Sequence, residues 1–149
     1  MNEPFGPHLT LDLKNCIKGR LTSVEHVWDI LNNLPDIIGM TKIMPPYVVK
    51  YTEGRIPEDW GLSGFIMIAE SHISIHTFPQ KDYVFIDVFS CRDFDTEKAA
   101  KYLISAFGAK KAVKQMMRRG LDFPRSERER ITHKIVRQLR LPKTLQIKE

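Results

Sequence analysis

Three runs of apolar residues between positions 64 and 90 constrain the fold most strongly. Residues 64–68, 71–78 and 83–90 are rich in Ile, Val and Phe, residue types that favour strands. The last two runs are separated by Pro-Gln-Lys-Asp at positions 79–82, which is typical of a tight turn. Consecutive strands joined by tight turns predict an antiparallel sheet.

Other segments carry strand or helix periodicity of the same kind. The further predicted strands are 9–13, 47–52 and 110–118, and the predicted helices are 23–33, 96–107 and 126–140. Thr22 and Glu25 form a capping box before the first helix, which we expect to end before Pro35. Asp95 caps the second helix and Gly108 ends it. The pattern predicts an α+β fold, a two-layer α/β sandwich whose mainly antiparallel sheet has the helices packed on one face.

Basic residues are concentrated near the end of the chain. The net charge is +5, but residues 110–149 hold 13 Lys and Arg against 4 Asp and Glu. A basic tail can bind nucleic acid, yet the solvated face of a helix accounts for this charge, so we do not expect a nucleic-acid partner. We predict a single domain over residues 1–120 and a basic, helical C-terminal extension over residues 121–149.

The chain carries no sign of a membrane or a secreted context. No stretch approaches 18 uninterrupted apolar residues, and the first residues have no basic segment followed by an apolar run. The two cysteines, Cys16 and Cys91, do not make a disulfide scaffold and are expected to be free thiols. We therefore predict a cytoplasmic protein with no membrane partner.

The strand at positions 71–78 is unusually polar. Alternation places His72, Ser74 and His76 on one face, which is either solvated or functional. Neither a Gly-x-Ser-x-Gly elbow nor the ligand spacing of a zinc site is present, so we expect no metal. A glycine-rich phosphate loop is absent as well.

The runs 62–79 and 83–91, with Glu70-Ser71-His72, His76 and Cys91 at their spacing, closely resemble the short prokaryotic S-adenosylmethionine decarboxylases. The resemblance covers about residues 5–118. It implies a proenzyme that cleaves itself between Glu70 and Ser71. It also implies that Ser71 becomes a pyruvoyl group, the cofactor that forms a Schiff base with the amine of the substrate.

The same resemblance implies roles for other residues. His76 would be the processing base, Ser63 would assist processing from a Leu-Ser-Gly turn, and Cys91 would donate the proton that replaces CO2. Glu70, Phe78 and Gln80 would bind substrate, although Phe78-Pro79-Gln80 stands where many members have Trp-Pro-Glu. Glutamine has fewer acceptor sites than glutamate for a ribose diol. Family members are also expected to form homodimers with the site near the interface.

The predicted function is therefore decarboxylation of S-adenosylmethionine, whose product donates aminopropyl groups for spermidine synthesis. Two alternatives stay open. A pyruvoyl-dependent arginine or ornithine decarboxylase uses the same fold, and a change in the pocket would be enough for the switch. A non-catalytic binding homologue would never be cleaved and would run as one band under denaturing conditions.

Overall fold

Six strands with alternating apolar residues build one antiparallel sheet in the computed structural model, which describes residues 3–140. They are β1 (Gly6–Lys14), β2 (Tyr47–Tyr51), β3 (Gly61–Ile68), β4 (Ser71–Phe78), β5 (Tyr83–Ser90) and β6 (Lys111–Arg119). Their order across the sheet is β2-β3-β4-β5-β1-β6, and every neighbouring pair is antiparallel. Short 3-10 helices, Pro57–Asp59 and Pro79–Lys81, precede β3 and β5.

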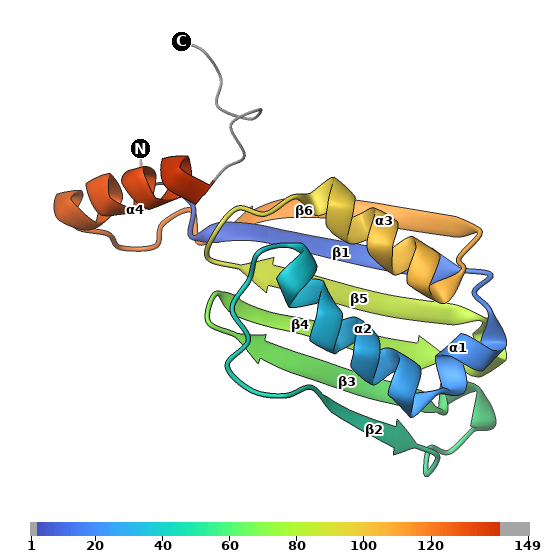
Figure 1. The fold of residues 1–149 in the computed structure, drawn as a ribbon. Coiled ribbons are helices and arrows are strands. Elements are labelled where there is room, and N and C mark those ends of the chain that lie inside the picture. The colour runs from blue at the N-terminus through green and yellow to red at the C-terminus, as the bar shows by residue number, and fades with distance from the viewer. Residues whose placement is uncertain (1–2, 141–149) are drawn as a thin grey trace.

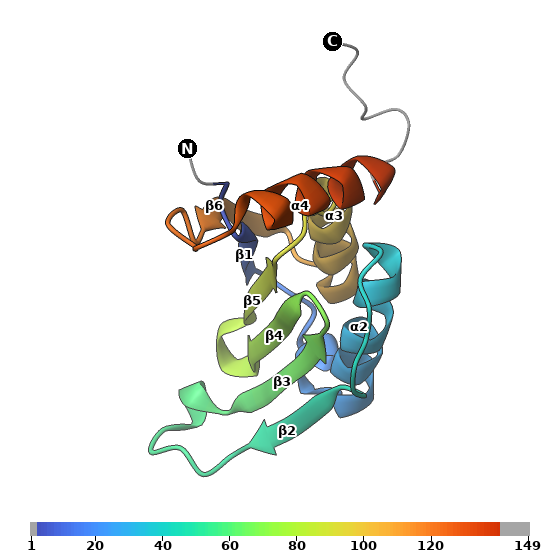
Figure 2. The same cartoon turned by 90° about the vertical axis from the view of Figure 1, so that its left-hand side faces the viewer.

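Three helices cover one face of this sheet, so the predicted two-layer α+β fold is confirmed (Figures 1 and 2). They are α1 (Lys18–Thr22), α2 (Val24–Ile37) and α3 (Thr96–Phe107). Every second side chain of the central strands points into this layer, and Leu9, Leu11 and Leu13 of β1 are at most 1% exposed. Burying each such leucine contributes on the order of 2 kcal/mol, so the core lies between helices and sheet.

A fourth helix, α4 (Glu127–Arg140), lies apart from this layer at one end of the sheet (Figure 1). The helix predicted over residues 126–140 is confirmed, while residues 141–149, including Pro142, lie outside the described chain. Within residues 3–140, no helix combines the length and the apolar character needed to span a membrane.

Helix α2 differs from its prediction at both ends. Its N-cap is Ser23, whose hydroxyl accepts a hydrogen bond from the His26 N–H at 3.1 Å, so the predicted capping box of Thr22 and Glu25 is wrong by one residue. Helix α2 also continues through Pro35 to Ile37. Pro35 lies in the last turn and is buried, so the missing N–H costs one bond while its ring packs in the core.

Strand β3 begins earlier than predicted and takes in the segment expected to form a turn. Ser63 lies inside this strand, opposite Val49 of β2 and His76 of β4. Gly64, the next residue, is buried under Leu31 and Val48, and a Cβ there would lie 2.9 Å from Leu31 Cδ1. The glycine therefore marks a close approach of helix α2 to the sheet, not a turn.

The other face of the sheet has no helix of the described chain packed over its centre (Figure 2). Cross-strand partners share a face, and the register places a series of exposed apolar side chains here. They are Tyr47, Val49, Phe65, Met67, Phe85, Val113 and Met117. We call this surface the open face.

Candidate active site

The Glu70–Ser71 bond lies at the turn between β3 and β4, at one end of the sheet. Ala69 and Glu70 form the two-residue connection, because Ile68 pairs directly with Ser71. Ser71 begins β4 and pairs on its other side with Ser90, the last residue of β5. Ser71 is half-buried and Glu70 is 7% exposed. The bond therefore lies in a tight turn in which Glu70 is buried, Ser71 is half-buried and Ala69 is exposed.

Cys91 follows β5 and meets this turn through its main chain. The Cys91 N–H donates a hydrogen bond to the Glu70 carbonyl oxygen at 2.8 Å. The half-buried thiol has its pKa raised, first by burial and then by the negative charge of Glu70. The raised pKa favours the protonated thiol at the residue that follows Ser90, the strand partner of Ser71.

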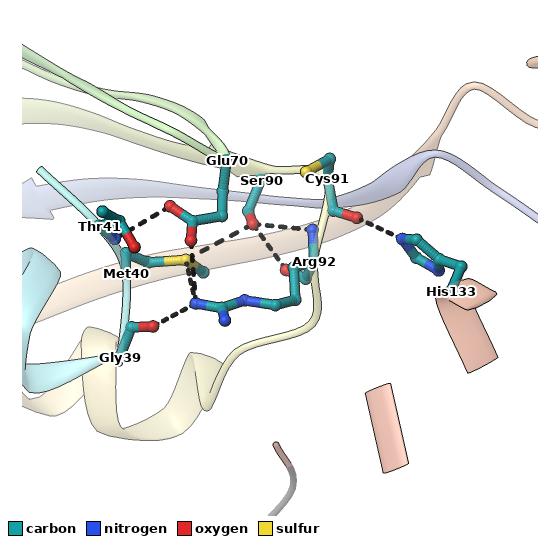
Figure 3. A network of polar contacts seen from close by, with 8 residues as sticks. All are labelled: Gly39, Met40, Thr41, Glu70, Ser90, Cys91, Arg92 and His133. Atoms are coloured by element: carbon teal, nitrogen blue, oxygen red, sulfur yellow. Dashed lines mark hydrogen bonds and ion pairs between the residues drawn. The ribbon is translucent and has the colours of Figure 1, made fainter. Parts of the chain in front are cut away.

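The carboxylate of Glu70 is held on both oxygens (Figure 3). Oε1 lies 3.1 Å from Nη2 of Arg92, and Oε2 accepts the main-chain N–H of Thr41 at 3.0 Å. The same Nη2 donates to the Gly39 carbonyl and lies 3.4 Å from Sδ of Met40. A buried carboxylate requires such partners, because desolvation without them costs several kcal/mol.

A second polar group lies on the open face at His72, the residue that follows Ser71. His72 stacks edge-on against Phe89, with 5.7 Å between ring centroids, and His8 contacts Asp87 at 2.8 Å. The pKa of His72 is lowered, mainly by burial and next by His8. The lowered pKa favours the neutral form of the imidazole at the residue that directly follows Ser71 in β4.

Ser63 and His76 form a pair of their own. Their side chains meet at 3.0 Å between Oγ and Nδ1, on the open face in the body of the sheet. His76 lies five residues after Ser71 on the same strand, which is roughly 16 Å at the rise of a β-strand. Within one chain, Ser63 therefore contacts His76, and both residues lie far from Ser71 along the sheet.

Phe78 and Gln80 lie still further from Ser71. Phe78 ends β4 on the open face and packs edge-on against Phe85, at 5.6 Å between centroids. Gln80, in the following 3-10 turn, lines a cavity of about 220 Å³ together with Trp60 and Pro79. Within one chain these two residues belong to the opposite end of β4.

Helix α4 reaches the Cys91 side of the site. Nε2 of His133 donates to the Cys91 carbonyl oxygen at 3.2 Å (Figure 3). His133 and Cys91 line a cavity of about 120 Å³ with Phe5, Asp93 and Arg118. Arg125, before α4, lies over the ring of Phe5 at 5.6 Å. The C-terminal extension thus forms one wall beside Cys91.

Arg92 and Thr41 are site residues that sequence reasoning missed. A basic residue next to Cys91 in a charged segment has no local signal of its own, and Thr41 contributes only its main-chain N–H. The one available hint was Glu70, since a carboxylate within apolar strands requires a partner. Among residues 3–140 no group of three or more His, Cys, Asp or Glu side chains is placed to hold a metal ion.

Comparison with solved structures first defines the class of protein. The fold matches the crystal structure of the adenosylmethionine decarboxylase from Aquifex aeolicus, with a TM-score of 0.69 and 27% identity. The match covers 84% of this chain and 96% of that one. This chain therefore has the fold of that decarboxylase, and the Glu70–Ser71 turn lies within it.

Sequence relatives define the family within that class. The sequence profile of S-adenosylmethionine decarboxylase matches residues 7–120. The S-adenosylmethionine decarboxylase proenzyme of Thermodesulfovibrio yellowstonii is 36% identical over 132 residues, covering 88% of this chain and 91% of the relative. The proenzyme of Pyrococcus furiosus is 35% identical over 135 residues, covering 90% of each chain. The chain belongs to the S-adenosylmethionine decarboxylase family.

Proposed function

We propose that this chain is a proenzyme that cleaves itself between Glu70 and Ser71 and then decarboxylates S-adenosylmethionine. The observation that carries the proposal is the hydrogen bond of 2.8 Å from the Cys91 N–H to the Glu70 carbonyl oxygen. It joins the carbonyl that would be attacked to the residue that would later donate a proton. The names of the relatives support the substrate and the proenzyme form.

Cleavage would begin with an acyl shift. The Ser71 hydroxyl oxygen attacks the Glu70 carbonyl carbon, the C–N bond breaks, and the hydroxyl proton ends on the Ser71 nitrogen. The Cys91 N–H faces the oxygen on which negative charge develops, as a donor in an oxyanion hole does. The product is an ester between residues 70 and 71.

Elimination would complete the cut. A base removes the Cα proton of Ser71, the Cβ–O bond breaks, and residue 70 leaves as a carboxylate. The dehydroalanine left at position 71 rearranges to an imine, and water replaces its nitrogen, which departs as ammonia. Two chains result, residues 1–70 and 71–149, the second beginning with a pyruvoyl group.

The surroundings of Ser71 fit such a group. Ser71 is half-buried and begins β4. Its strand partner is Ser90, and Cys91 is the next residue after Ser90. When formed, the pyruvoyl group supplies a carbonyl that accepts electrons as CO2 leaves the substrate. Cys91, whose pKa is raised, holds a proton that it can deliver to the substrate carbon.

We further propose that two protomers complete each site. His76 and its partner Ser63 lie roughly 16 Å along β4 from Ser71, too far for a base to act within one chain. A second copy stacked on the open face would bring its own Ser63 and His76 to the turn. Phe78 and Gln80 follow His76 closely and would arrive with it as substrate-binding residues.

The open face supports a homodimer of this kind. Phe65, Phe85, Met67 and Tyr47 are 40%, 42%, 46% and 57% exposed in the single chain. Contiguous exposed apolar groups on one surface mark interfaces between proteins. The profile match ending at residue 120 also supports a decarboxylase domain of residues 1–120, followed by an extension of residues 121–149.

Two measurements on the purified protein test this function. Mass spectrometry of the denatured protein is expected to find chains 1–70 and 71–149, the second starting with pyruvate. Release of CO2, with S-adenosylmethionine, arginine and ornithine offered in parallel, is expected from S-adenosylmethionine alone. An uncut chain would support a non-catalytic homologue. Turnover of arginine or ornithine would show that the pocket binds a basic amino acid instead of S-adenosylmethionine.

A further inference from the structure

We propose that Arg92 is a positioning residue for self-cleavage, one that holds the Glu70 side chain so that the Glu70 carbonyl faces the Cys91 N–H. The inference rests on the proposed cleavage between Glu70 and Ser71. Arg92 contacts Glu70 at the carboxylate, one side chain away from the bond to be cut. Its effect would pass through the carboxylate of Glu70.

The ion pair is almost completely withdrawn from solvent. The side chain of Glu70 is 8% exposed and that of Arg92 is 15% exposed, with 3.1 Å between Oε1 and Nη2. A buried ion pair often contributes little net stability, because desolvation offsets the attraction. Fixed geometry at residue 70 is what such a pair provides here.

The buried residue Ser90 fixes the position of the Arg92 main chain. The Ser90 hydroxyl accepts the Arg92 N–H at 2.9 Å and donates to the Arg92 carbonyl at 2.7 Å (Figure 3). These two bonds fix the backbone of residues 90–92. The Cys91 N–H and the Arg92 side chain are thereby both directed at Glu70, one at its carbonyl and one at its carboxylate.

The loop at residues 39–41 holds residue 70 from the other side. Thr41 accepts the Ala69 N–H at 2.8 Å and donates its own N–H to Glu70 Oε2 at 3.0 Å. Arg92 also donates to the Gly39 carbonyl, so the guanidinium ties this loop to Glu70. Removing the guanidinium would take away one of the two contacts that hold the Glu70 carboxylate and the contact that ties Gly39 to it.

The acyl shift is the step that depends on this arrangement. Attack by Ser71 requires its oxygen and the Glu70 carbonyl carbon to be held close and aligned, and such alignment contributes large factors to an intramolecular rate. The elimination step acts on the Cα proton of Ser71 instead. Loss of Arg92 is therefore expected to slow formation of the ester rather than its breakdown.

The test follows cleavage of freshly translated chains over time, by gel and by mass. Arg92→Met is expected to cleave roughly 10- to 100-fold more slowly than the wild type, the effect of losing a charged hydrogen-bond partner. The uncut Arg92→Met chain should resist hydroxylamine, because no ester has formed. The His76→Ala chain provides the contrast, since it should accumulate an ester that hydroxylamine cleaves.

A matched control is Arg20→Met. Arg20 donates to the main-chain carbonyls of Ser105 and Ala106 at 2.8 and 3.1 Å, remote from the Glu70 turn, and its variant should cleave at the wild-type rate. Guanidinium at millimolar concentration should restore cleavage to Arg92→Ala, and Arg92→Lys should retain part of it. Rescue of this kind distinguishes positioning from a failure to fold.

Several outcomes would overturn the inference. Wild-type rates in Arg92→Met, or hydroxylamine-sensitive ester in that variant, would show that Arg92 does not act on the acyl shift. Slow cleavage that guanidinium and lysine both fail to restore would indicate a general structural role. A wild-type chain that stays uncut would instead contradict the proposed self-cleavage. That outcome is distinct from a failure of the role proposed for Arg92.

Discussion

At the scale of single residues, Cys91 is subject to two influences that act in the same direction. Burial of the thiol and the nearby Glu70 carboxylate both raise its pKa above the ordinary value. Both disfavour the thiolate, so the protonated form persists to higher pH than in a free cysteine. A proton donor requires this state, whereas a nucleophilic cysteine requires the reverse.

This property predicts how the thiol reacts with iodoacetamide, which consumes the thiolate. In an uncut Ser71→Ala chain that also carries Cys16→Ser, alkylation should begin at a higher pH than for a free thiol. Replacing Glu70 with Gln should move the onset to lower pH, because the negative charge is lost. Peptide mass spectrometry across a pH series measures the rate, and an onset at or below that of free cysteine would contradict the prediction.

Sequence reasoning proposed some candidate site residues and missed others for a physical reason. Ser71, His76 and Cys91 were selected because Glu-Ser-His, His and Cys at their spacing resemble the S-adenosylmethionine decarboxylases. Arg92 and the Thr41 N–H could not be selected, because their importance arises only when the loop at residues 39–41 folds against Glu70. The separation of His76 from Ser71, by contrast, followed from the predicted strand 71–78, which the structure confirms as β4.

At the scale of elements, α4 is an amphipathic helix whose apolar stripe is uncovered. Ile131, Ile135 and Leu139 recur every four residues along one side of the helix, and they are 55%, 51% and 78% exposed. The helix instead touches the domain through His133 at the Cys91 carbonyl. Periodicity could predict this helix, but not where it packs.

A chain that ends at Arg125 and lacks α4 tests this weak attachment. Little apolar surface of the stripe is buried in the single chain, so the free energy of unfolding should change by less than about 1 kcal/mol. Self-cleavage should proceed, because no residue of the Glu70 network is lost. Urea unfolding measures the change, and a much larger loss would show that the stripe is covered by a partner subunit.

Other elements were predictable to the extent that their signals are local. The caps of α3, Asp95 and Gly108, act within a few residues and were found correctly, with Gly108 at a φ of 60°. Pro35 was misjudged because a proline in a final helical turn is tolerated when its ring is buried. Burial depends on the tertiary fold, which a local pattern does not contain.

At the scale of the whole molecule, the separation of His76 from Ser71 predicts that two different defects complement each other. A Ser71→Ala chain and a His76→Ala chain should each stay uncut alone. Expressed together, they should form mixed dimers in which one site has an intact Ser71 from one chain and an intact His76 from the other. The His76→Ala chain should then be cleaved.

Mass spectrometry distinguishes the two chains in this experiment. Cleavage of the His76→Ala chain is expected only when the partner is present, and at most one site per mixed dimer can be restored. A double variant, Ser71→Ala with His76→Ala, is the control partner and should restore nothing. If co-expression leaves both chains intact, His76 does not act across an interface.

The strand order interleaves the two halves of the chain. Residues 1–70 contribute β1, β2 and β3, and the remaining residues contribute β4, β5 and β6. Because β1 lies between β5 and β6, the two halves meet at three ladders, β3 with β4, β5 with β1, and β1 with β6. After a cut at residue 70, neither fragment could leave without opening all three ladders, so the cleaved protein would unfold as one cooperative unit.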